Sequence, residues 1–105
     1  MKKIALLSLL LMTSFVQAKE VTCSDKIDSI SLQSSGSVWI WPDRHETIEL
    51  KPTHPKFYEF LGIMFYAMKS GKTVVYKSDN GERYSNKCHD TETSLYPLYE
   101  ILRVN

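Results

Sequence analysis

Both tryptophans of the chain stand in one short stretch that also carries charged and ionisable side chains. Residues 37–45 read SVWIWPDRH and include Trp39 and Trp41, followed at once by a proline and then Asp43, Arg44 and His45. Aromatic rings with one polar edge suit partly wet surfaces, such as subunit interfaces and sugar-binding floors. The three residues after the proline supply hydrogen-bond donors and acceptors beside the rings. These five residues are our candidate ligand contacts.

Alternation inside this stretch separates the rings from the core. Successive side chains of a strand point to opposite faces of the sheet. Val38 and Ile40 therefore share one face, which we expect to face the core, and Trp39 and Trp41 share the other. The rings are predicted to lie on the outer surface, as an interface or as a binding floor.

The remaining chemistry-bearing residues form no enzyme signature. His45, His54 and His89 are too scattered for a zinc-binding pattern. The segment SGKT at 70–73 imitates the end of a phosphate-binding loop, but the predicted order is helix–loop–strand and not strand–loop–helix. Paired carboxylates occur in no special environment. We therefore predict a non-enzymatic protein without a cofactor or a metal site.

Two cysteines, Cys23 and Cys88, follow the first 18 residues. In an exported protein such a pair most simply forms a disulfide. The alternative is a nucleophile–base dyad of Cys88 and His89. Adjacent residues of a strand point to opposite faces, and no third group is evident to orient the histidine. We expect the disulfide.

The N-terminal segment predicts export. Residues 1–18, MKKIALLSLLLMTSFVQA, begin with two lysines, continue with a short apolar run and end on a small residue. This is the pattern of a secretory signal peptide, whereas a membrane anchor needs about 20 apolar residues. We expect cleavage after Ala18, a single domain over 19–105, and a periplasmic or secreted location.

The charge balance argues against a nucleic-acid partner. Removal of 1–18 takes two of the thirteen basic residues and none of the twelve acidic ones, which leaves eleven against twelve and a net charge of −1. A nucleic-acid-binding domain usually carries a basic surplus. No second apolar run of spanning length follows, so we expect no membrane span in the mature chain.

The elements that position these residues follow from periodicity and turn signals. Strands are predicted over 27–32, 38–41, 47–51, 72–78 and 95–104. The first three form an antiparallel meander, with a bulge after Ile27. Asn80 and Gly81 favour a turn before a short returning strand at Tyr84. Pro97 implies an edge or a bulge in the last strand. The predicted order is β-β-β-α-β-β.

A single helix is predicted over 55–70, with Pro55 in its first turn and Gly71 just past its end. Its sequence, PKFYEFLGIMFYAMKS, is apolar on most sides, and such a helix is normally buried on most sides. A mature chain of 87 residues has too little material to wrap it. Either the helix belongs to the core and leaves some aromatic residues exposed, or part of it packs on another subunit, and we expect the second arrangement. The residues assigned to this interface are Phe60, Ile63, Phe65 and Ala67.

The order of these features is similar to that of a known family. A cysteine comes just before the first predicted strand in VTCSDKIDSISL, and a meander and one apolar helix follow. SGKTVVYKS then precedes the second cysteine and a last strand. Over nearly all of 21–104 this arrangement resembles the B subunits of bacterial AB5 toxins, most closely the Shiga type. The segment KFYEFLGIMFYAMKSGKTVVYKS also resembles the helix-and-strand segment of the subtilase and typhoid toxin B subunits.

The resemblance implies a mainly β protein with one helix, folded as a small five- to six-stranded barrel of the oligonucleotide/oligosaccharide-binding (OB) class. It implies a pentameric ring centred on the helices, an intrachain Cys23–Cys88 disulfide and a cell-surface glycan as ligand. The family's glycan contacts are not implied. The loop that is acidic in the Shiga-type subunits reads QSSGS here, and PTHPKF replaces the segment that carries their tryptophan.

These observations predict an exported, homo-oligomeric binding module whose ligand is a glycan or a protein. The alternative is a periplasmic structural protein, or an inhibitor of the immunity type, that binds one protein partner through the same exposed aromatic residues. Aromatic side chains serve either function, because they are suited to wet interfaces of both kinds.

Overall fold

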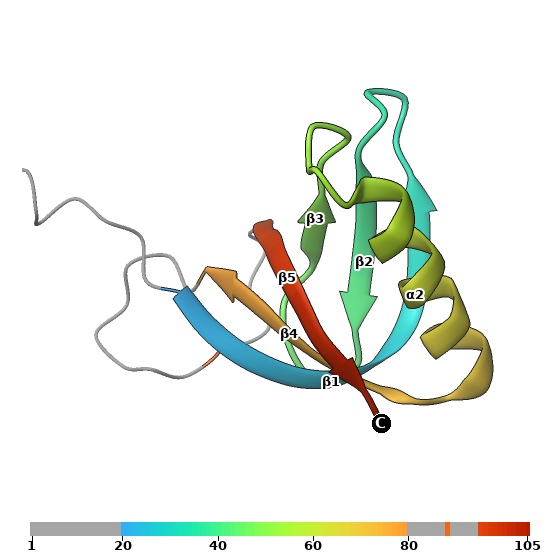
Figure 1. Ribbon diagram of the computed structural model, residues 1–105, viewed down its shortest axis with the longest axis vertical. Helices are drawn as coiled ribbons and strands as arrows, with labels where there is room; N and C mark the ends of the chain where they lie inside the picture. The colour runs from blue at the N-terminus through green and yellow to red at the C-terminus, as the bar shows by residue number, and fades with distance from the viewer. Residues whose placement is uncertain (1–19, 80–87, 89–94) are drawn as a thin grey trace, which may run out of the picture.

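The fold is seen in a computed structural model, which describes residues 20–79, 88 and 95–105. The predictions for the signal peptide, the turn at Asn80 and Gly81, the strand at Tyr84, and His89 lie outside the described residues. In the described part, the elements are β1 (Glu20–Leu32), β2 (Val38–Pro42), β3 (Ile48–Leu50), α2 (Phe57–Ser70), β4 (Thr73–Asp79) and β5 (Tyr96–Val104) (Figure 1).

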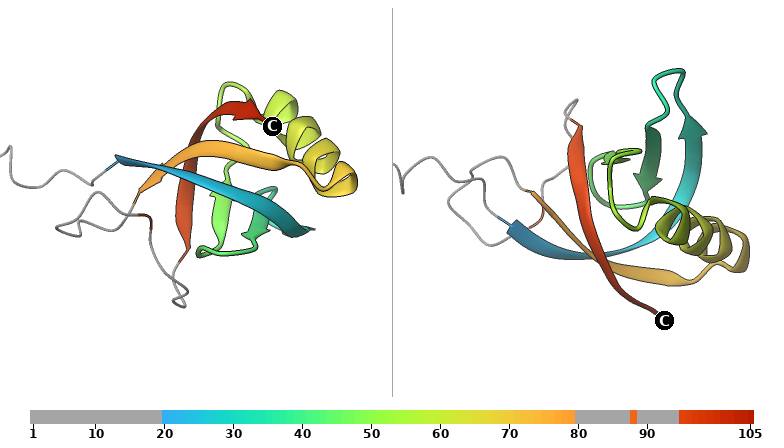
Figure 2. Two further views of the ribbon diagram at one scale, coloured as in Figure 1. Left: turned by 90° about the horizontal axis from the view of Figure 1, so that it is seen from below. Right: turned by 45° about the horizontal axis from the view of Figure 1, so that its top comes forward.

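The five described strands hydrogen-bond in the order β1-β2-β3-β5-β4 and close into a ring. Neighbouring strands are antiparallel, except that β3 and β5 run parallel. β1 is strongly curved (Figure 2) and pairs with β4 through Glu20–Lys26 and with β2 from Ile27 onward. A register shift between Ile27 and Ser29 lies where β1 passes from one partner to the other, so the predicted bulge is confirmed.

The predicted class, mainly β with one helix, is confirmed, and the predicted element order agrees with the described strands and helix. The start of the first strand was predicted too late, at residue 27, whereas β1 begins at Glu20. Its early inward-facing positions are Val21, Cys23 and Asp25. An aspartate at an inward position disguised the apolar alternation that marks a half-buried strand.

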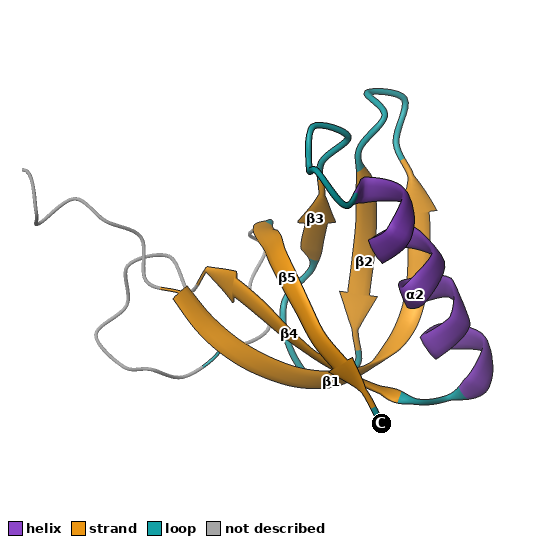
Figure 3. Ribbon diagram, in the orientation of Figure 1, coloured by secondary structure: helices purple, strands orange, loops and turns teal. Residues whose placement is uncertain are grey.

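The helix begins two residues later than predicted and ends where expected. α2 starts at Phe57, with Lys56 as its N-cap residue, so Pro55 precedes the helix. Gly71 has φ of 66° and donates its N–H to the Ala67 carbonyl, which confirms it as the C-terminal cap. α2 packs against β1 and β4 (Figure 3).

The core fills the ring and continues under one face of α2. The buried core residues are Val21, Cys23, Ile27, Val38, Ile40, Ile48, Leu50, Phe60, Met64, Ala67, Val74, Tyr76 and Leu98. Phe60 and Ala67 are 3% and 0% exposed within one chain, so these two residues of the predicted interface face the core. Ile63 is partly buried against the same core, and only Phe65 of the four is exposed. The closed ring supplies more apolar surface to the helix than the chain length led us to expect.

Cys23 and Cys88 form a disulfide with a Cα–Cα distance of 5.8 Å. The predicted bond is confirmed, and it removes Cys88 as a free nucleophile. Disulfides persist in oxidising compartments, so the bond indicates a location outside the cytoplasm. Among the described residues, no helix is long and apolar enough to cross a membrane.

Candidate functional site

The two tryptophans lie on the outer face of β2. Val38 and Ile40 are 1% and 0% exposed, whereas Trp39 and Trp41 are half-buried and alternate with them. The ring centroids are 6.2 Å apart at an interplanar angle of 66°, an edge-to-face pair. The alternation predicted from the sequence is thus what the structure shows. The two indole rings therefore lie next to each other on the outside of the ring of strands.

Strand register places polar side chains on both sides of these rings. Trp39 lies opposite Ser31 of β1 and Glu49 of β3, and Trp41 lies opposite Ser29 of β1. Residues directly opposite each other share one face of a sheet. The outer surface formed by Ser29, Ser31, Trp39, Trp41 and Glu49 is called the tryptophan face below. It combines two indole rings with two hydroxyl groups and one carboxylate.

The carboxylate of the tryptophan face is available to a ligand. Glu49 is partly exposed, and no ion pair of the described residues includes it. Ser31 accepts a hydrogen bond from Gln33 Nε2 at 3.0 Å and keeps its own hydroxyl hydrogen as a donor. The surface can therefore offer both donors and acceptors beside its rings.

The other three predicted ligand contacts, Asp43, Arg44 and His45, interact with residues of β1. The Asp43 carboxylate accepts from the Lys26 N–H at 3.1 Å, and the Asp43 N–H donates to the Lys26 carbonyl at 3.0 Å. Arg44 Nη2 donates to the Ser24 carbonyl. The structure thus joins the loop after β2 to β1, and does not gather Asp43, Arg44 and His45 on the tryptophan face.

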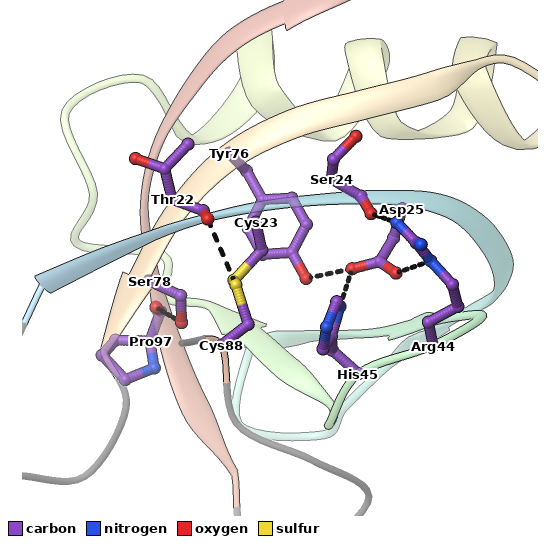
Figure 4. Close-up of a disulfide and its surroundings, with 10 residues drawn as sticks. All are labelled: Thr22, Cys23, Ser24, Asp25, Arg44, His45, Tyr76, Ser78, Cys88 and Pro97. Atoms are coloured by element: carbon purple, nitrogen blue, oxygen red, sulfur yellow. Dashed lines mark hydrogen bonds and ion pairs between the residues drawn. A yellow bond between two sulfur atoms is a disulfide. The ribbon is translucent and has the colours of Figure 1, made fainter. Parts of the chain in front are cut away.

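Asp25 of β1 is the residue that Arg44 and His45 of this loop contact (Figure 4). Its side chain is fully buried, and its Oδ1 lies 3.4 Å from Arg44 Nε. Its Oδ2 lies 2.6 Å from His45 Nδ1 and accepts from the Tyr76 hydroxyl at 2.7 Å. We call Asp25, Arg44, His45 and Tyr76 the Asp25 cluster. It joins β1, β4 and the loop between β2 and β3.

Electrostatics explain why this cluster is stable. A buried carboxylate is costly unless charge-assisted hydrogen bonds compensate it, and Arg44 supplies a permanent positive charge. Burial raises the pKa of the Tyr76 hydroxyl, and the negative charge of Asp25 together with the hydrogen bond to it raises that pKa further. Tyr76 therefore remains a neutral donor to the carboxylate. The arrangement holds structure together rather than exposing a reactive group.

Sequence reasoning missed Asp25 and Tyr76. Asp25 stands between Cys23 and Ile27 in a run whose alternate residues all face inward. A charged residue in register with apolar ones is a signal of a buried polar partner, and it was available in the sequence.

The described residues contain no group of three or more His, Cys, Asp or Glu side chains that could hold a metal ion. Comparison with protein-family models, curated proteins and solved structures finds no match for this chain. The geometry of the tryptophan face and the strand topology therefore carry the functional argument.

Proposed function

We propose that the protein is an exported, non-enzymatic binding module of the OB class that holds a glycan on the tryptophan face. The strand order supports the class, because the OB fold is a five-stranded Greek-key barrel. In that class the surface of strands 2 and 3 and the loop between strands 1 and 2 bind oligosaccharides and oligonucleotides. Trp39 and Trp41 of β2 and Glu49 of β3 lie on that surface.

The observation that carries the proposal is the pair of partly exposed indole rings 6.2 Å apart, flanked by hydroxyl and carboxylate groups. The C–H faces of a sugar ring stack on an indole, while its hydroxyls exchange hydrogen bonds with the polar flank. A net charge of −1 without 1–18 favours this ligand over an oligonucleotide, whose phosphates need a basic surface.

The proposal includes a relationship to toxin B subunits and a homo-oligomeric assembly. One helix after a meander and a disulfide from β1 support the resemblance seen in the sequence. The surface of α2 supports association, because Tyr58, Phe65 and Tyr66 are 86%, 36% and 56% exposed. Grouped exposed aromatic residues usually mark an interface. Ile63 lies partly buried at the border of this surface.

The competing function is a periplasmic structural or inhibitor protein that binds one protein partner. The same three aromatic side chains of α2 favour it, since aromatic residues are enriched in protein interfaces. Sugar binding and partner binding then use different surfaces, β2 and α2. Substitutions on one surface therefore separate the two functions.

The test is a Trp39→Ser/Trp41→Ser double variant on a glycan array. Because both rings lie outside the core, we expect sugar binding to be lost while cooperative thermal unfolding persists. Tyr58→Ser on α2 is the matched control and should still bind sugar. Folded wild-type protein that binds no glycan would move the function to a protein partner. A strict monomer in light scattering would exclude the oligomer.

A further inference from the structure

A pocket opens beside the tryptophan face where β3 and β5 part. Their parallel pairing is only two residue pairs long and ends with Glu49 opposite Pro97. Beyond that pair, the loop after β3 and the continuing β5 enclose a space of about 210 Å³. Leu98 lines it from the core side, and Lys51 and Thr53 line it from the loop.

The pocket and the tryptophan face share Glu49. This residue lies directly opposite Trp39 across β2 and β3, and it also lines the pocket. Neighbouring strands are about 4.8 Å apart, so a group stacked on Trp39 lies about one strand spacing from Glu49, which lines the pocket. A single ligand can therefore occupy both.

One wall of the pocket is held rigidly by His54. Its Nδ1 accepts from the Lys56 N–H at 3.0 Å, so its Nε2 carries the hydrogen and donates to the Tyr99 carbonyl at 2.8 Å. The imidazole also packs on Phe60 with a centroid distance of 4.9 Å. These contacts join the loop to β5 and to α2. A wall fixed before binding lowers the entropy cost of holding a ligand.

The charges of the pocket define the ligand's chemistry. Glu49 accepts hydrogen bonds and Lys51 donates them, and no ion pair of the described chain joins either to another residue. A hydroxyl group both donates and accepts, so neighbouring hydroxyls of a neutral sugar satisfy both side chains. The charges of Glu49 and Lys51 cancel, so the pocket offers no surplus positive charge to an acidic sugar.

The volume of the pocket limits the size of the ligand group that it can hold. About 210 Å³ is smaller than the roughly 300–1,000 Å³ of pockets that enclose a drug-sized ligand. The pocket therefore takes one ring unit of a larger molecule, and the remainder lies on the indoles.

We propose that this pocket is a second sugar subsite and that the ligand is a neutral oligosaccharide of at least two pyranose units. One unit stacks on Trp39, and the next lies between Glu49 and Lys51. The inference rests on the proposed glycan-binding function and adds the length and the charge of its ligand.

The test compares sugar pairs by tryptophan fluorescence and calorimetry with the full protein. The probes are lactose, cellobiose and chitobiose, the monosaccharides galactose, glucose and N-acetylglucosamine, and 3′-sialyllactose as the acidic counterpart. At least one neutral disaccharide should bind about tenfold more tightly than its monosaccharides, because hydrogen bonds to charged groups add that much affinity. Sialyllactose should bind more weakly than lactose.

Two substitutions locate the second unit. Thr53→Phe fills the pocket from the exposed loop, and Lys51→Ala removes its cationic donor. Both should abolish most of the disaccharide preference while monosaccharide affinity stays within about twofold. Lys72→Ala, an exposed lysine after α2 that does not line the pocket, is the control for charge.

The outcomes distinguish the subsite from the proposed function. An unchanged disaccharide preference in both variants, or equal affinities for mono- and disaccharides, overturns the second subsite and leaves the tryptophan face as the binding site. Preference for sialyllactose overturns the neutral ligand. Wild-type protein that binds none of these sugars overturns the subsite, and a glycan array without a ligand overturns the proposed function itself.

Discussion

At the scale of single residues, Asp25 is the position whose burial most requires specific partners. Its carboxylate is fully buried, and three side chains from other parts of the chain contact it. Burying a carboxylate costs roughly several kcal/mol of desolvation free energy, and the groups that bond to the carboxylate must offset that cost. The partners are unequal in exposure, since the Arg44 side chain is 64% exposed and that of His45 is 20% exposed.

Asp25→Ala should lower the free energy of unfolding by about 2 kcal/mol, measured by urea denaturation. The loss stays below the ~3–5 kcal/mol typical of a broken buried pair, because Arg44 can turn to water when its partner is removed. The Tyr76 hydroxyl has no such route and is left buried without an acceptor. Asp28→Ala, at an exposed position of the same strand, should change the value by less than about 0.5 kcal/mol. Equal effects of the two substitutions would contradict a structural role for the cluster.

The Tyr76 hydroxyl also predicts how stability depends on alkaline pH. Burial first, and the Asp25 charge next, raise the pKa of Tyr76 above its ordinary value, so the folded protein retains this proton. A tyrosine in the unfolded chain ionises near about pH 10. The stabilisation that the protonated Tyr76 hydroxyl contributes is complete below that pH. It is lost as pH rises above it, by up to about 1.4 kcal/mol per pH unit.

Urea unfolding of wild type and Tyr76→Phe between about pH 9 and pH 11 isolates this group. The pKa of Tyr99 is also raised, by partial burial and then by Asp79, but Tyr99 is present in both proteins. The phenylalanine variant should therefore show the shallower loss of stability. Parallel pH profiles would show that Tyr76 titrates freely in the folded protein.

At the scale of elements, helix α2 owes its end to backbone geometry and its position to packing. The chain turns from α2 into β4 through Gly71, whose φ of 66° disfavours any residue with a Cβ atom. Phe60, Met64 and Ala67 meanwhile anchor one face of the helix in the core. The turn thus directs β4 into its place between β1 and β5.

A matched pair of glycines tests this explanation. Gly71→Ala should destabilise the protein by about 1 kcal/mol, because alanine is strained at a positive φ. Gly62→Ala should stabilise it by about 0.5–1 kcal/mol, since the exposed helical position has nothing within 4 Å of the added Cβ atom. The two thermal shifts, measured by circular dichroism, should have opposite signs. Shifts of the same sign would contradict the assignment of the cap.

At the scale of the whole molecule, ring closure and the disulfide act on segments far apart in the sequence. Closure gives each described strand two neighbouring strands, although β1 pairs with β4 and with β2 through different segments. The disulfide joins β1 to Cys88 across a sequence separation of 65 residues. Both constraints favour a compact native state without a large core.

Replacing both cysteines by alanine should remove about 4 kcal/mol of stability in the chain-entropy treatment of a loop this long. The urea dependence of the free energy should also become steeper, because the unfolded chain without the crosslink is less compact. Reduced wild-type protein should behave like the variant. A change below about 1 kcal/mol in both would mean that the bond restrains the unfolded chain very little.

Local pattern was enough to predict several features of this protein. The outward direction of Trp39 and Trp41 follows from the two-residue period of a strand, and the end of α2 follows from Gly71. The bulge after Ile27 and the Cys23–Cys88 pair were also predictable. Each of these depends on the properties of neighbouring residues or on the redox compartment.

The tertiary structure alone decided which distant groups meet. Asp25 contacts His45 and Tyr76, which are 20 and 51 residues away, because β1 lies between β2 and β4 in the closed ring. The same closure buries Phe60 and Ala67 within one chain and forms the pocket where β3 and β5 part. Local periodicity sets the face of an element on which a side chain lies. Its partner across that face depends on how strands from distant parts of the chain pair.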